Sequence, residues 1–108
     1  MIYLIEKSNI IEKLANILFN SVDQKYEKLH CNYNSIYGTI STSISYEINS
    51  ERVSIEAPVG VASKNLELCL ELRELMKSHT GEEWDSFTLT LYADGKAHTK
   101  FHYPDVAS

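Results

Sequence analysis

The stretch from Trp84 to Tyr103 constrains the fold most, because its alternation and turn residues define a β-hairpin. A two-residue Asp-Gly loop would mix core and solvent residues on one face of that hairpin. A three-residue loop, Ala93-Asp94-Gly95, instead aligns the core-facing positions of the two strands: Leu91 with Ala97, Leu89 with Thr99 and Phe87 with Phe101. This register predicts a type I turn followed by a bulge, with Gly95 in the left-handed conformation.

The opposite face of the predicted hairpin is polar. Because side chains alternate along a strand, its members share one side of the sheet. They are Thr88, Thr90, Tyr92, Lys96, His98, Lys100 and His102. We expect this face to be exposed and available to a partner.

Helical periodicity appears twice in the chain. Ser8 or Asn9 can cap a first helix, whose apolar stripe runs from Ile10 to Val22. Residues 1–5 either extend this helix or form a separate strand. A second helix is predicted after Ser63 as its cap. It should be largely buried and end just before Gly81.

Alternating apolar residues predict three strands between these helices. The strands cover 26–34, 40–48 and 53–57, with turn residues at 34–38 and at 49–51. Pro58 and Gly60 should end the third strand. The order α-β-β-β-α-β-β with short connections predicts an α+β domain, in which both helices pack on one face of a five-stranded antiparallel sheet.

Size and charge narrow the function classes. The chain has 108 residues, which predicts one domain over 1–108 with a sizeable core. Its net charge of −5 argues against a nucleic-acid-binding protein, which needs a cationic footprint. The N-terminal apolar run is interrupted at Glu6-Lys7, and no segment approaches about 18 apolar residues. We therefore expect a cytoplasmic protein that does not bind membranes.

The negative charge is concentrated between residues 67 and 85, where six acids face two bases. The acids are Glu67, Glu71, Glu74, Glu82, Glu83 and Asp85. They could form an ordinary solvated helix face, or a surface complementary to a basic partner. A metal site would need further oxygen ligands and a Gly-Asp-rich loop that the chain lacks, so no metal or other cofactor is expected.

Catalytic groups are hard to assemble from this sequence. His98 and His102 share a strand face, but four residues of extended chain separate them by roughly 13 Å. His30 could approach them across the sheet, although no Ser, Cys or carboxylate has the spacing of a triad. Cys31 and Cys69 have no CxxC or His partner and are expected to be reduced and buried. We therefore expect no enzymatic activity.

Two aromatic residues are candidates for a contact surface. Trp84 could be an interface hot spot, but we expect it to anchor the hairpin in the core, with its indole N–H bound to a neighbouring group. Tyr92, on the polar hairpin face, is the tyrosine best placed for a contact patch, although tyrosine also simply favours strands.

A family resemblance rests on the C-terminal pattern. An acidic helix, Trp84, an alternating strand, the Gly95-Lys96 turn and a strand ending Phe101-His102-Tyr103 resemble the YezG-like immunity proteins, antitoxins of polymorphic, contact-dependent-inhibition-type toxin systems. The resemblance extends weakly to residues 11–14 and 26–29. Such proteins bind one cognate toxin, and those that block nucleases commonly present acids to the toxin's phosphate-binding cleft.

The resemblance makes an immunity protein the leading hypothesis. It implies a cytoplasmic monomer that forms a 1:1 complex with a basic toxin, with a nuclease as the expected class, and occludes its active site. The expected toxin-binding residues are Glu67, Glu71, Glu74, Glu82, Glu83, Asp85 and Tyr92. The sheet face bearing Tyr92, His98 and Lys100, or the loop over 34–38, is an alternative contact. A small acidic secretion chaperone is the second hypothesis and a small hydrolase or nuclease the third.

Overall fold

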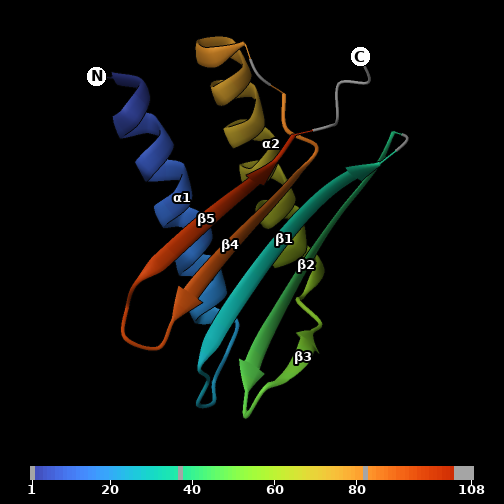
Figure 1. The fold of residues 1–108 in the computed structure, drawn as a ribbon. Helices are drawn as coiled ribbons and strands as arrows, with labels where there is room; N and C mark the ends of the chain where they lie inside the picture. The colour runs from blue at the N-terminus through green and yellow to red at the C-terminus, as the bar shows by residue number, and fades with distance from the viewer. Residues whose placement is uncertain (1, 37, 82, 104–108) are drawn as a thin grey trace.

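The computed structural model describes residues 2–36, 38–81 and 83–103. Its elements are α1 (Ile2–Asn20), β1 (Lys28–Ile36), β2 (Thr39–Ile48), β3 (Glu51–Ile55), α2 (Val59–Thr80), β4 (Ser86–Tyr92) and β5 (Ala97–His102). The strands form one antiparallel sheet in the order β3-β2-β1-β4-β5, and both helices lie side by side against one face of it (Figure 1). The predicted α+β class and element order are therefore confirmed.

The C-terminal hairpin has the register predicted from its sequence. Leu91 pairs with Ala97, Leu89 with Thr99 and Phe87 with Phe101. The Gly95 N–H donates to the carbonyl of Tyr92 at 2.9 Å, and the Tyr92 N–H donates to the carbonyl of Lys96 at 2.8 Å. Gly95 has a φ of 93°, as the bulge requires, so a side chain there would be strained.

Both helices begin earlier than their predicted caps. Helix α1 begins at Ile2 rather than at Ser8 or Asn9, so the alternative in which the N-terminal residues extend the helix is correct. This early start is stabilised by α2. The ring of Tyr3 stacks on His79, with centroids 4.6 Å apart, and so holds the first turn of α1 against the end of α2.

Helix α2 begins at Val59, with Pro58 at its N-cap position, so the predicted cap at Ser63 is wrong. Proline has a fixed φ that suits a helix start, and the Pro58 carbonyl accepts the Ala62 N–H at 2.9 Å. Gly60 lies in the first turn of the helix rather than after a strand. The predicted stop at Gly81 is confirmed by its φ of 75° and by its N–H, which donates to the Lys77 carbonyl.

The ends of two strands also differ from prediction. Strand β1 continues through Asn34 and Ser35, which were expected in a turn, because the Ser35 N–H donates to the Asp85 carbonyl at 2.8 Å. Tertiary pairing with the segment before β4 thus overrides the turn preference of these residues. Strand β3 covers Glu51–Ile55 rather than 53–57, because Asn49 and Ser50, with φ values of 52° and 66°, form the tight turn after β2 without Glu51.

The core lies between the sheet and the helices. Leu72 of α2 and Trp84 are fully buried in it, and Trp84 meets the ring of Tyr33 edge-on at 5.3 Å. The indole N–H of Trp84 donates to the sulfur of Met76 at 3.3 Å, which confirms its anchoring role in the core. Cys31 and Cys69 are buried free thiols, as predicted.

Candidate functional site

The face of the sheet opposite the helices (Figure 1) is here called the outer sheet face, and the strand registers place polar side chains on it. Leu29, Cys31 and Tyr33 of β1 are buried on the helix side of the sheet. Because side chains alternate along a strand, the even-numbered residues of β1 and their strand partners lie on the outer sheet face. Across the paired strands it comprises Arg52, Ser54, Ser41, Ser43, Ser45, Glu47, Lys28, His30, Asn32, Asn34, Ser86, Thr88, Thr90, Tyr92, His98, Lys100 and His102. Hydroxyl, amide and charged groups thus cover a sheet face on which no described helix packs.

Three predicted acids project from α2. Glu67, Glu71 and Glu74 are all exposed along this helix. Glu67 lies 3.9 Å from the Lys64 ammonium group. Glu71 and Glu74 form no ion pair with any residue that the structure describes. Their carboxylates are therefore available to a partner, although the charge of Glu74 also acts on the Lys77 ammonium and helps to raise its pKa. The charge of Glu67 is partly compensated by Lys64.

Two further acids, on the loop between α2 and β4, are used within the protein. Glu83 lies 2.7 Å from the Lys77 ammonium and 3.7 Å from the Arg73 guanidinium. The hydrogen bond from Lys77 lowers the pKa of the Glu83 carboxyl, and Glu83 in turn raises the pKa of Lys77. Asp85 lies 3.1 Å from Nδ1 of His102. Glu82 lies outside the described residues. This loop is consequently less negative than its sequence suggests.

Tyr92 lies apart from the acids. It ends β4 whereas Asp85 precedes β4, and seven residues of extended chain correspond to roughly 23 Å. On the outer sheet face, the Lys28 ammonium lies 5.7 Å from the centroid of the Tyr92 ring. The predicted site residues thus occupy separate regions of the molecule rather than one continuous patch.

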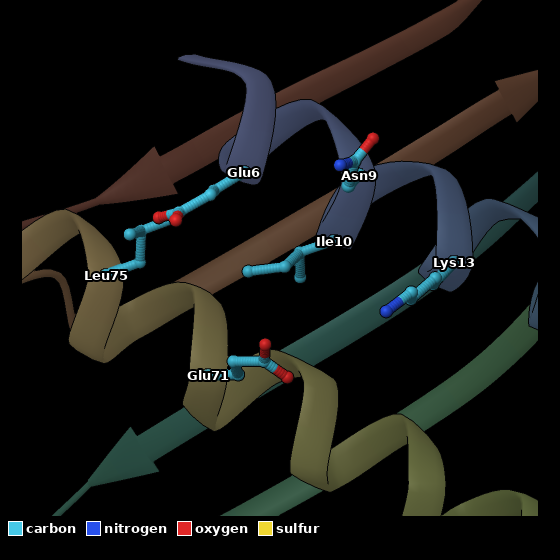
Figure 2. Close-up of a pocket in the computed structure, with 6 residues that line it drawn as sticks. All are labelled: Glu6, Asn9, Ile10, Lys13, Glu71 and Leu75. Carbon is cyan, nitrogen blue, oxygen red and sulfur yellow. The ribbon is translucent and has the colours of Figure 1, made fainter. Parts of the chain in front are cut away.

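A cavity of about 310 Å³ opens between the two helices. Figure 2 shows that its lining comes from both helices: Glu6, Asn9, Ile10 and Lys13 of α1, and Glu71 and Leu75 of α2. Sequence reasoning named only Glu71 of these. The spacing of Glu6, Asn9 and Lys13 at i, i+3 and i+7 indicates that they share one face of α1. Glu71 therefore borders a groove that holds the charged side chains of Glu6 and Lys13 as well as the apolar side chains of Ile10 and Leu75.

His30 is the most enclosed ionisable group on the outer sheet face. His30 is only 9% exposed, and a hydrogen bond joins its Nδ1 to the Thr90 hydroxyl at 3.2 Å. Nε2 lies 3.6 Å from a carboxylate oxygen of Glu47. Burial lowers the pKa of His30, and the positive charge of Arg52 lowers it further.

The Thr90, His30 and Glu47 side chains have the composition of a catalytic triad, but the described residues do not give them the surroundings of one. The Thr90 hydroxyl lies on β4, an inner strand with β1 on one side and β5 on the other. A reaction centre also needs a pocket and oxyanion donors. Four cavities lined by described residues lie elsewhere, and neither Thr90 nor His30 lines any of them. Within the described residues, no group of three or more His, Cys, Asp and Glu could hold a metal ion.

A family model described as "Immunity protein YezG-like" matches residues 8–108, nearly the whole chain. The chain therefore belongs to the YezG-like immunity protein family, and the resemblance seen in its sequence is confirmed. Immunity proteins bind a cognate toxin. Among curated proteins, none matches this chain. Neither helix, over its described residues, is long and apolar enough to span a membrane.

Proposed function

We propose that this protein acts in the cytoplasm as a monomer, binds one copy of a cognate toxin, and neutralises it by covering its active site. It acts as an inhibitor and performs no chemistry on the toxin. The observation that carries this proposal is the pair Glu71 and Glu74, whose exposed carboxylates have no ion partner among the described residues of a chain in the immunity family.

The chemistry of these acids favours a basic toxin, with a nuclease as the best candidate. A nuclease must bind the phosphate backbone, so its cleft is cationic. Uncompensated carboxylates attract such a cleft over a distance and penalise contacts with acidic surfaces. Glu71 also borders the cavity between the helices, where the apolar side chains of Ile10 and Leu75 can contact the stem of a toxin side chain. We place the centre of the toxin interface here.

The remaining predicted contact residues would lie around this centre. Glu67 and Glu83 can exchange their internal ion partners for toxin cations, and Asp85 can do the same if it releases His102. Glu82 is proposed from its position in the sequence alone. Tyr92 would belong to a second contact, because it lies on the outer sheet face. A standard interface covers about 800 Å² on each partner, which is wide enough to reach beyond one helix.

Co-expression provides the test. Candidate toxin domains are the C-terminal segments of large secreted proteins of the same host. We expect one such domain to arrest growth when produced alone, and to be tolerated and co-purified 1:1 when this chain is present. Purified nuclease activity should fall in proportion to added protein until the ratio is one to one. A homodimer that retains the N-terminal segment of an effector, without inhibiting any toxin, would contradict the proposal and indicate a chaperone.

A further inference from the structure

Strand β5 presents a backbone edge that no other described strand covers. It is the last strand in the sheet order, and β4 is the strand with which it pairs among the described elements. Exposed edge strands offer unpaired N–H and C=O groups, and a protein that does not cover them can add a strand from another chain. The edge of β5 is therefore a candidate binding surface separate from α2.

The hydrogen bonds at the two ends of β5 identify which of its backbone groups face outward. The carbonyls of Lys96 and His102 accept N–H groups of Tyr92 and Asp85, at 2.8 and 2.9 Å. Backbone groups alternate in direction along an antiparallel strand, so the even-numbered residues face β4. The N–H and C=O groups of the odd-numbered residues, Ala97, Thr99 and Phe101, consequently point away from the sheet.

The side chains of β5 carry a charge preference. The strand contains no acidic residue, and His98 and Lys100 are exposed on the outer sheet face. Lys100 has no ion pair with any residue described in the structure. An added strand would place its own side chains opposite these groups, where opposite charges stabilise the pair and like charges destabilise it.

We propose that the β5 edge binds an extended, acidic peptide segment of a partner protein as a sixth strand of the sheet. Acidic residues at alternate positions of that segment would face His98 and Lys100, while its backbone would pair with Ala97, Thr99 and Phe101. The net charge of −5 opposes this weakly, because charges beyond about 8 Å are screened at physiological salt. The inference goes beyond the proposed toxin contact and does not depend on it.

A second copy of this chain fits the edge poorly. In an antiparallel pairing centred on Thr99, His98 of each copy would face Lys100 of the other. Two such contacts between basic groups would weaken the pairing. The other free edge, β3, carries Glu51 and Arg52 together and shows no charge preference of this kind.

The test uses the full chain and two synthetic probes. The first is a capped heptapeptide, Thr-Glu-Val-Glu-Val-Glu-Thr, and the second has Lys in place of each Glu. Amide hydrogen exchange, measured residue by residue by NMR, reports which edge is covered. We expect a saturating amount of the Glu peptide to slow exchange of the outward amides of Ala97, Thr99 and Phe101 by about tenfold or more, and the Lys peptide to leave them unchanged.

Two variants separate charge from backbone pairing. Lys100→Glu should abolish the slowing by the Glu peptide and create slowing by the Lys peptide. Ala97→Pro removes one outward N–H at the exposed first residue of β5 and should weaken Glu-peptide binding. Ser54→Pro makes the matched change at the β3 edge and should not affect binding. Equal slowing by both peptides, slowing at β3, or a dimer that already protects these amides would overturn the proposal.

Discussion

The Lys77 ammonium lies 2.7 Å from a carboxylate oxygen of Glu83, joining the last turns of α2 to the loop that leads into β4. This ion pair is exposed. The contact shows that part of the acidity between residues 67 and 85 serves the fold. The charge left for a partner is concentrated at Glu71 and Glu74, and these two residues are the centre of the proposed interface.

Arg73 should matter more to stability than Lys77, although both contact Glu83. The Nε–H of Arg73 donates to the Trp84 carbonyl at 3.0 Å and so holds the loop beside the buried indole. We expect Arg73→Ala to lower the free energy of unfolding by about 1.5 kcal/mol, because a partly buried carbonyl loses a charged donor. Lys77→Ala should leave it nearly unchanged, because its ion pair is exposed. Urea denaturation of both variants checks this order, and equal losses would contradict it.

Leu72→Ala should act on folding rather than on toxin binding. Leu72 is fully buried between α2 and the sheet. Removing three methyl-sized groups from such a site leaves a cavity, and we expect a loss of about 3 kcal/mol in the free energy of unfolding. The affinity of the folded fraction for toxin should stay at the wild-type value. Denaturation midpoints and calorimetric titration below the unfolding transition measure the two effects separately. Weakened binding by fully folded protein would place Leu72 under the interface.

Protonation of His30 should make the protein less stable as the pH falls. Its pKa in the folded protein is below the ordinary value of 6.5, chiefly because of burial. As the pH falls below about 6.5, the unfolded chain therefore binds more protons at this site than the folded chain, and the free energy of unfolding decreases. The effect stops below the folded pKa. Denaturation at a series of pH values should show this decrease in wild type and a flatter curve in His30→Gln. Identical curves would mean that another group causes the decrease.

The register of the C-terminal hairpin was predictable to the residue, because the side-chain alternation and the turn residues there specify the same pairing. Alternation fixes which face is buried, and the Ala93-Asp94-Gly95 loop fixes the register. The helix starts were not predictable in this way. Ser8 and Ser63 are good caps in isolation, but the Tyr3 stack on His79 and the fixed φ of Pro58 decide where the helices begin.

The candidate site was only partly accessible from sequence. Acid spacing along α2 correctly indicated an exposed row, because helical periodicity is local. The ion partners of Glu83 and Asp85 depend on how distant elements approach one another. The cavity shared by Glu6, Lys13 and Glu71 requires the packing of α1 on α2, which no local pattern specifies.

The most direct test of the proposed interface is the affinity of the toxin domain for the double variant Glu71→Lys, Glu74→Lys, measured by calorimetry at several salt concentrations. The matched control reverses Glu51 and Glu56, two exposed acids at the two ends of the edge strand β3. We expect the control to bind like wild type, with an affinity that falls as salt rises. The Glu71 and Glu74 variant should bind at least about tenfold more weakly and lose that salt dependence. Wild-type affinity and salt dependence in this variant would contradict the account.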